Sequence, residues 1–306
     1  MKNIKFVSII LAVYIFFAFI LINKNNQIEN FDPSEYKDAF SEFYAMLFDK
    51  VFSEDDMYKA EVNLISKFIE KNRVNPALEK DNIKILDAGS GPGRHLQYIS
   101  QKYKTIGCDR SRNMIRRSKL RNPLAEVKEK DLKEVEAFGE GEFSHILCLK
   151  DTLYHNEKKD WNEILSNFYY WLQPGGYLVI HVFDPEKLDP APRNFSQYTK
   201  DENKRKHAVT HFKKFSHDAW WTKSNSNKDK HYLHELVLGK NGDKKMFKNR
   251  LYIPKKEEVL DEINRNIFKL ESIDHLEDLE IYDHEIYYFR KPLKMKENVI
   301  KSKNAD

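Results

Sequence analysis

Between residues 82 and 183, short apolar runs alternate with segments of helical periodicity. Apolar runs predict strands at 83–87, 105–108, 125–127, 143–149 and 176–183. The intervening periodicity predicts helices at 94–102, 111–120 and 158–172. Two of the runs, 146–149 and 178–182, are almost wholly apolar, as expected of strands covered on both faces. The alternation predicts crossover connections and an α/β fold whose mostly parallel sheet carries helices on both faces.

The flanking regions add further elements. Periodicity predicts two earlier helices, at 36–52 and 56–72. After residue 184 the alternation stops, and a polar, basic and aromatic stretch predicts an insertion with a small antiparallel sheet, with strands at 231–238 and 247–252. A helix is predicted from Pro254 to Ile267, with proline in its first turn. Two closing strands, at 268–273 and 285–288, are predicted to complete the main sheet.

The N-terminal segment has the pattern of a membrane anchor. Phe6 to Ile22 is apolar except for Ser8, and Lys2 and Lys5 precede it. As a helix this run would rise ~26 Å, at the short end of what spans a bilayer. A signal peptide is the alternative, but no small-residue cleavage site follows, which favours a retained single-pass transmembrane helix. By the positive-inside rule, the basic residues before the apolar run place the rest of the chain outside the cytosol. Two reduced thiols suit the cytosol instead, so the sequence leaves open on which side of the membrane the catalytic domain lies.

The composition of the chain is that of an ordinary globular protein. The chain has 306 residues, 41% hydrophobic and 33% charged, with a net charge of +4, which describes a globular protein and does not by itself indicate nucleic acid. Cys108 and Cys148 lie in apolar runs and are predicted to be buried thiols, and no Cys/His spacing predicts a metal site. The predicted division is an anchor (1–23), a linker (24–35), a core (36–184), an antiparallel insertion (185–250), the rest of the core (251–292) and a charged tail (293–306).

A glycine-rich loop follows the first predicted strand. The strand ends at Asp87, and Gly89, Gly91 and Gly93 follow it. Glycine lets the backbone turn sharply and approach a ligand, and the next helix offers free N–H groups. The spacing is G-x-G-x-G, with Arg94 where a dinucleotide fingerprint has its third glycine. Together with Ser90, this loop predicts a cofactor site for either a dinucleotide or a sulfonium compound.

Acids follow the next two predicted strands. Asp109 ends the second strand beside Arg110, where a carboxylate can accept both hydroxyls of a ribose. The alternative is that Asp109 merely caps the following helix, a role that Ser111 can fill alone. After the third strand, Asp131 and Leu132 can meet an adenine ring, although Asp131 taken alone is also an ordinary loop acid.

The turn Pro174-Gly175-Gly176 completes an order of motifs that resembles the class I methyltransferases. The resemblance covers about 36–291 and implies a Rossmann-like, seven-stranded sheet with S-adenosylmethionine as cofactor. In this family the glycine loop holds the methionine and ribose portion of the cofactor, the acid after the second strand meets the ribose, and the acid after the third strand meets the adenine. The resemblance therefore implies these roles for Asp87, Gly89, Gly91, Asp109, Asp131 and Leu132. Segments 36–52, 143–149 and 171–182 are particularly similar to uncharacterised methyltransferases of large DNA viruses.

The loop after the fourth strand faces the methyl group in this family. Lys150, Asp151, Tyr154 and His155 are therefore the candidates for contacting the acceptor or taking its proton, with local packing as the alternative. The loop lacks an Asn/Asp-Pro-Pro-Tyr sequence, and Cys148 lies within the strand, so methylation of nucleic-acid bases is disfavoured. We expect methyl transfer to an O- or N-nucleophile of a small molecule.

Other interpretations stay open. The insertion carries basic residues at 204–207 and the pair Trp220-Trp221, which could bind RNA or an acidic small molecule, although a charged run is usually a solvated surface. We expect the insertion to cover the acceptor site. A catalytically inactive membrane or virion protein with the same fold is one alternative. An NAD-linked oxidoreductase is another, disfavoured by Arg94 and the Pro174 turn. The acceptor and the oligomeric state are left undetermined.

Overall fold

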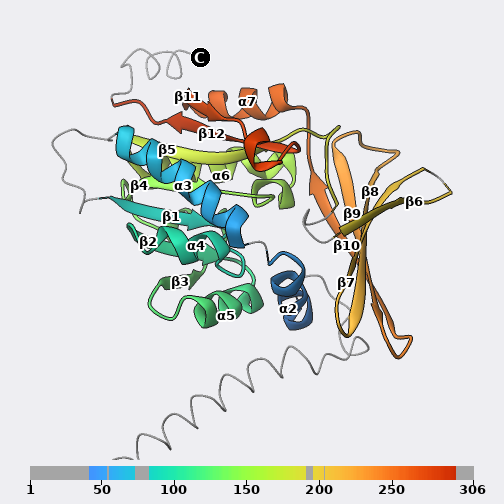
Figure 1. Cartoon of the computed structure of the whole chain (residues 1–306). Coiled ribbons are helices and arrows are strands. Elements are labelled where there is room, and N and C mark those ends of the chain that lie inside the picture. Colours follow the sequence, from blue (N-terminus) through green and yellow to red (C-terminus); the bar gives the residue numbers. More distant parts are fainter. Residues whose placement is uncertain (1–40, 54, 73–82, 191–195, 203, 294–306) are drawn as a thin grey trace, which may run out of the picture.

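The computed structural model describes residues 41–53, 55–72, 83–190, 196–202 and 204–293 (Figure 1). The predicted anchor and linker, and the charged tail beyond residue 293, lie outside the described residues. Within the described part of the chain, no helix is long and apolar enough to cross a membrane. The membrane anchor therefore stays a prediction from the sequence.

A seven-stranded sheet, sheet A, forms the centre of the protein, in the order β11-β12-β5-β4-β1-β2-β3. Its strands are β1 Lys84–Ala88, β2 Lys104–Asp109, β3 Glu126–Glu129, β4 Phe143–Cys148, β5 Leu172–Phe183, β11 Lys269–Asp274 and β12 His284–Arg290. Strands β1 to β5 pair in parallel, and β12 is antiparallel to both β5 and β11. The predicted seven-stranded, mostly parallel sheet is confirmed.

Helices cover both faces of sheet A (Figure 1). One face carries α3 Asp55–Lys71, α4 Arg94–Ile99 and α5 Arg112–Arg121, and the other carries α6 Lys158–Trp171 and α7 Lys256–Arg265. Short 3-10 turns lie at η3 Val135–Ala137, η4 Leu153–His155 and η5 Glu277–Leu279. Because successive residues of a strand face opposite sides, Ile146 of β4 packs in the cluster under α6 and Leu147 in the cluster under α3.

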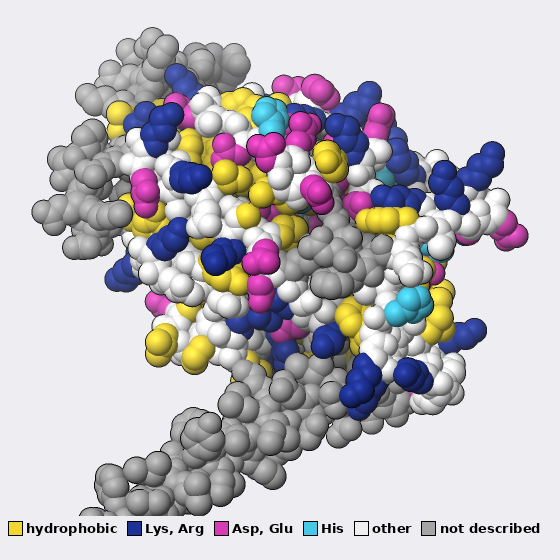
Figure 2. All heavy atoms as spheres, in the orientation of Figure 1, with side chains coloured by type: hydrophobic (Ala, Val, Ile, Leu, Met, Phe, Trp, Pro, Cys, Tyr) yellow, Lys and Arg dark blue, Asp and Glu magenta, His cyan; other side chains and the backbone are white. Residues whose placement is uncertain are grey.

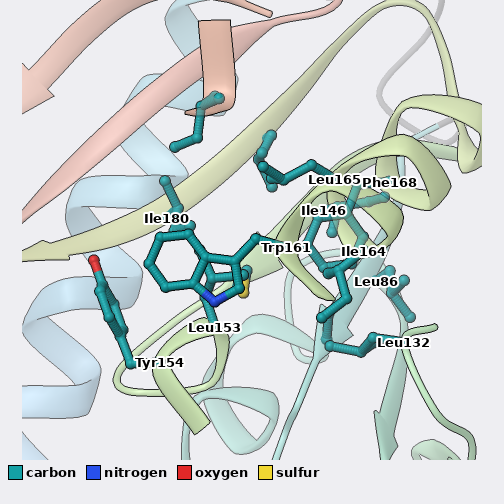
Figure 3. Packing of buried hydrophobic residues seen from close by; sticks show 14 of the residues in the cluster. Leu86, Leu132, Ile146, Leu153, Tyr154, Trp161, Ile164, Leu165, Phe168 and Ile180 are labelled. Atoms are coloured by element: carbon teal, nitrogen blue, oxygen red, sulfur yellow. The ribbon is translucent and has the colours of Figure 1, made fainter. Parts of the chain in front are cut away.

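The larger core cluster centres on Trp161 of α6, which is fully buried (Figure 3). Its indole contacts the ring of Tyr154 edge to face, with centroids 5.6 Å apart, and its Nε1 donates to Asn156 O at 3.1 Å. Cys108 and Cys148 are buried free thiols in the same cluster, as predicted. This cluster holds β4 and the loop after it against α6.

A second sheet, sheet B, has five antiparallel strands in the order β10-β9-β8-β7-β6. The strands are β6 Ser196–Lys200, β7 Lys206–His211, β8 Phe215–Lys223, β9 Lys230–Gly239 and β10 Lys244–Tyr252. The sequence predicted only two of them. The inward side of β8 and β9 includes His217 and Glu235, which bond to each other at 3.0 Å, so these polar residues interrupt the apolar alternation that marks a half-buried strand.

Helix α2, Glu42–Val51, lies between sheet B and α5 (Figure 1). It begins later than predicted, because Ser41 has a non-helical backbone and its hydroxyl accepts from Tyr44 N–H at 3.2 Å as the N-cap. The ring of Phe43 stacks on Phe247 of sheet B with centroids 5.6 Å apart. The prediction of Pro254 in the first turn of the later helix is also wrong, since α7 starts at Lys256 after an extended Lys255.

Trp161→Ala is expected to lower the free energy of unfolding by about 3–5 kcal/mol, because truncating a fully buried large aromatic leaves a cavity. Tyr170→Ala on the same helix is the control, since that side chain is 41% exposed and should cost well under half as much. Urea unfolding of both variants measures the difference. Equal losses would contradict this assignment of the core.

Candidate active site

Three glycines shape the loop after β1. Gly89, Gly91 and Gly93 have φ angles of 70°, 51° and 78°, in the left-handed region that glycine adopts without strain. A Cβ at Gly89 would overlap the side chain of Thr152, which belongs to the loop after β4. The two loops can therefore approach this closely only because Gly89 has no side chain.

A pocket lies beside this loop at the carboxyl ends of β1 to β4, where open α/β sheets bind their ligands. We call it the glycine-loop pocket. It brings together nine of the ten predicted cofactor-binding residues: Asp87, Gly89, Ser90, Gly91, Arg94, Asp109, Arg110, Asp131 and Leu132. The tenth, Gly93, does not line it and instead precedes α4 as its N-cap residue. Of the four predicted catalytic residues, Lys150, Asp151 and His155 line the pocket.

Two carboxyl groups face each other across the glycine loop. Asp109 accepts from Gly91 N–H at 3.0 Å and from Ser111 N–H at 2.8 Å, while the Ser111 hydroxyl caps α5. Asp87 is buried, with 3% of its surface exposed. Burial and the neighbouring charge of Asp109 raise the pKa of Asp87 to about 7. Burial also raises the pKa of Asp109, so a polar ligand that donates to these groups would relieve an unfavourable pair.

Arg94 has a structural role that its sequence position did not reveal. Its guanidinium lies 5.9 Å from the ring of Tyr58, and Nη1 donates to Asp55 at 2.8 Å. Nη2 lies 3.3 Å from a carboxylate oxygen of Asp49 on α2, which also pairs with Arg117 at 2.7 Å. The side chain thus borders the pocket while fixing α2 and the start of α3 around it.

The loop after β4 holds a carboxylate–imidazole pair. Asp151 Oδ2 lies 3.1 Å from His155 Nε2. Burial raises the pKa of Asp151, but the charge and hydrogen bond of His155 outweigh it and leave that pKa below its usual value. Tyr154 is placed as the alternative of local packing predicts, and not in contact with the acceptor space. It is fully buried, donates to His181 O at 3.1 Å and lines neither this pocket nor the one described below, because its ring packs against Trp161 and Phe183.

A buried polar cluster that sequence reasoning missed anchors this loop. Glu61 of α3 is fully buried, and its carboxylate contacts Lys150 Nζ at 2.6 Å and His95 Nε2 at 2.6 Å. Burial raises the pKa of Glu61, but the charge of Lys150 together with His181, His284 and His95 outweighs burial and holds that pKa well below its usual value. No motif marks Glu61, because its partners come from elements far along the chain.

Glu61, His181 and His284 also have ligand atoms within 4.8 Å of one another, a spacing compatible with a metal ion. However, Lys150 Nζ lies 2.6 Å from Glu61 and 3.5 Å from His284. The backbone N–H of Lys150 donates to His181 Nδ1 at 2.9 Å, so the neutral His181 ring carries its hydrogen on Nε2 and offers no second lone pair. The cation held by this cluster is therefore the Lys150 ammonium.

A second pocket adjoins the first and is walled by sheet B. We call it the apolar pocket. It shares six lining residues with the glycine-loop pocket: Phe48, Tyr58, Met114, Lys150, Asp151 and His155. Its outer wall includes Trp221, Leu233, Asn249 and Leu251 of sheet B. The insertion, expected from the sequence to cover the acceptor site, thus supplies a wall of this pocket.

Residues 85–176 match the family model described as a methyltransferase domain. Solved structures with the same architecture include an S-adenosylmethionine-dependent methyltransferase of Clostridium acetobutylicum, with a TM-score of 0.62 and 15% identity over 81% of this chain and 98% of that one. Residues 85–176 therefore match a methyltransferase domain, and the chain shares the fold of S-adenosylmethionine-dependent methyltransferases.

Particular relatives act on amines. The phosphoethanolamine N-methyltransferase of Plasmodium falciparum is 26% identical over 58% of this chain and 65% of its own length. The phosphoethanolamine N-methyltransferase 1 of Triticum aestivum is 27% identical over 56% of this chain, which covers only 34% of that relative. The sugar N-methyltransferase KedS8 of Streptoalloteichus has a TM-score of 0.61 and 16% identity over 86% of this chain and 98% of its own.

Gly89→Ala is expected to weaken S-adenosylmethionine binding more than tenfold, because the new methyl group displaces Thr152 and the loop that it belongs to. Gly242→Ala is the matched control: its φ is also positive and a Cβ there meets open space, but it lies in the turn between β9 and β10 and does not line the pocket. Isothermal titration gives the affinities, and thermal unfolding checks that both variants fold. Equal losses of affinity in both variants would indicate a general effect of an alanine at a positive φ and contradict the role of the contact with Thr152.

Asp87→Asn tests the raised pKa. In the wild type without ligand, the Asp87 carboxyl has a pKa near 7 in the folded state and near 4 in the unfolded state. The folded protein therefore loses stability as pH rises from about 4 to about 7, because the folded state holds this proton more tightly. The free energy of unfolding should therefore fall by about 2 kcal/mol more in the wild type than in Asp87→Asn between pH 5 and pH 8. Urea unfolding at both pH values measures this difference, and parallel pH dependences would contradict it.

Proposed function

We propose that the protein transfers a methyl group from S-adenosylmethionine to the nitrogen of a small-molecule amine. The observation that carries the proposal is the junction of the two pockets at the end of β4. Lys150, Asp151 and His155 line both of them, so a donor in one pocket and an acceptor in the other would meet at these side chains. Positioning two reactants in this way is the main requirement of an in-line displacement.

The glycine-loop pocket has the chemistry to hold the cofactor. Gly89 and Gly91 leave backbone exposed, Ser90 Oγ is buried with no protein partner among the described residues, and Asp109 presents a carboxylate suited to ribose hydroxyls. Asp131 and Leu132 lie in the same pocket on the side of β3 and would meet the adenine. When bound, S-adenosylmethionine supplies an electrophilic methyl group, and these residues would bind and orient it.

The pair of Asp151 and His155 suits an amine acceptor. An alkylamine is protonated at neutral pH and must lose a proton before its nitrogen can attack a methyl group. Asp151 stays a carboxylate because its pKa is lowered, so it can bind the ammonium ion and, with His155, receive the proton. The N-methyltransferases among the relatives and structural neighbours support nitrogen as the acceptor atom.

The basic segment 204–207 supports a small molecule over nucleic acid. Arg205 pairs with Asp201 at 2.5 Å, Lys206 with Asp189 at 3.1 Å and His207 with Asp218 at 2.9 Å. Figure 2 shows lysine and arginine side chains interspersed with acidic ones over the visible face. A surface that binds a phosphate backbone instead concentrates cations in a groove or stripe.

Asp151→Asn is expected to lower the turnover number for amine methylation at pH 7 about a hundredfold, while the affinity for S-adenosylmethionine changes less than threefold. The assay follows the labelled methyl group from S-adenosylmethionine onto a panel of small amines and matched alcohols. The defect should shrink at pH 10, where a much larger fraction of the amine is already neutral.

Asp184→Asn, at the end of β5 and outside both pockets, is the control and should keep wild-type turnover. Methylation of the alcohols alone would contradict nitrogen as the acceptor atom. Binding of S-adenosylmethionine without methylation of any compound in the panel would favour a catalytically inactive protein.

A further inference from the structure

The lining of the apolar pocket identifies the class of amine. Resting on the function proposed above, we infer that the acceptor is an amine with an apolar, ring-sized body and an uncharged hydroxyl group at its far end, and that Asn249 and Trp221 recognise the hydroxyl. Three features carry this inference: the apolar walls, the balance of charges, and two buried polar atoms that have no partner in the described part of the chain.

Apolar and aromatic side chains make up most of the pocket wall. They come from α2, α3, sheet A and sheet B, and include Phe48, Phe52, Met57, Phe183, Leu233 and Leu251. Such a wall stabilises an apolar ligand body by removing it from water, at about 25 cal/mol for each Å² of apolar surface buried. A flexible, fully polar acceptor would gain little from this surface.

The charges of the pocket favour a cation and disfavour an anion. Among the described lining residues there is no arginine, and the one lysine, Lys150, is bound to Glu61 at 2.6 Å. Carboxylates of Asp151, Asp189 and Asp283 line the same space, and each also contacts a basic side chain: His155, Lys206 and His284 respectively. A phosphate group would lose its hydration without gaining a free cationic partner, which is costly. The pocket therefore suits an amine without a phosphate, in contrast to the substrate named for the phosphoethanolamine relatives.

Asn249 lines this pocket and has an unsatisfied hydrogen-bond acceptor among the described residues. Its side-chain nitrogen donates to Tyr44 Oη at 2.6 Å and to Glu235 Oε2 at 2.7 Å. A carboxylate only accepts hydrogen bonds, so Glu235 fixes which end of the amide faces it. The amide oxygen is left without a protein partner among the described residues, although Asn249 is only 4% exposed. Buried polar atoms are normally satisfied, so this oxygen indicates a ligand donor.

Trp221 adds a donor to the same wall. Trp221, Leu233 and Asn249 are paired across β8, β9 and β10 and all line the pocket, so they form one row on the inner face of sheet B. The indole Nε1–H of Trp221 is buried and also lacks a partner among the described residues. A hydroxyl group is the smallest uncharged substituent that can both donate to Asn249 and accept from Trp221.

Three probe amines test the inference: tyramine, phenethylamine, which lacks the hydroxyl, and phosphoethanolamine. Each is titrated calorimetrically into the full-length protein saturated with S-adenosylhomocysteine. We expect tyramine to bind about tenfold more tightly than phenethylamine, the value of one neutral hydrogen bond, and both to bind more tightly than phosphoethanolamine. Asn249→Leu should remove the preference for tyramine while leaving the affinity for phenethylamine within threefold.

His217→Gln is the matched control. His217 bonds to the other oxygen of Glu235 at 3.0 Å but does not line the pocket, so this variant disturbs the same buried carboxylate without removing a pocket group. It should lower the melting temperature and keep the preference for tyramine. A loss of preference in both variants would instead indicate a structural role for Asn249 and overturn its assignment.

The outcomes separate this inference from the proposed function. Methylation of phosphoethanolamine with no binding of the two aromatic amines would overturn the inference and leave amine methylation intact. Equal binding of tyramine and phenethylamine to the wild type would overturn recognition of the hydroxyl. A protein that binds S-adenosylmethionine but methylates no amine would contradict the proposed function itself.

Discussion

The ion pair between Glu61 and Lys150 is the interaction on which the geometry of the site depends. Glu61 is fully buried, and a buried carboxylate without a partner would be strongly destabilising. Lys150 supplies the charge at 2.6 Å, and His95 of α4 supplies a second contact at 2.6 Å. Lys150 also has a φ of 52°, which a non-glycine residue rarely adopts without surrounding support. The pair thereby fixes the direction in which the chain leaves β4, and with it the positions of Asp151 and His155.

Helix α2 extends this arrangement from one pocket to two. On one side, Asp49 pairs with Arg94 and Arg117 of the methyltransferase core. On the other, the ring of Phe43 stacks on Phe247 of sheet B at 5.6 Å. Because α2 is attached on both sides, Phe48 on the same helix lines both pockets at once. Sheet B is held against the core, so its inner face forms a wall of the site and not a separate module.

The sequence was informative where one local rule decides the structure. Apolar runs predicted the strands of sheet A, and the glycines after Asp87 predicted the loop beside the pocket. It was uninformative where polar residues satisfy each other over long distances. The sequence marked Lys150 as a candidate, but nothing in it pointed to Glu61, 89 positions away, as the partner of Lys150. Strand β8 was missed because His217 points inward to meet Glu235. The role of Tyr154 stayed open because a tyrosine after a strand can equally well line a pocket or fill the core.

The two pockets therefore differ in what can be inferred about their ligands. The glycine-loop pocket lies mainly within residues 85–176, the part that matches the methyltransferase domain, so its motifs predict the cofactor. The outer wall of the apolar pocket comes from sheet B and α2, outside that segment. Resemblance to methyltransferases thus says nothing about residues such as Trp221 and Asn249, and the acceptor has to be argued from their chemistry. Since Asp151 and His155 belong to the matched segment and yet line both pockets, the same proton-accepting pair can serve whichever acceptor the sheet B wall admits.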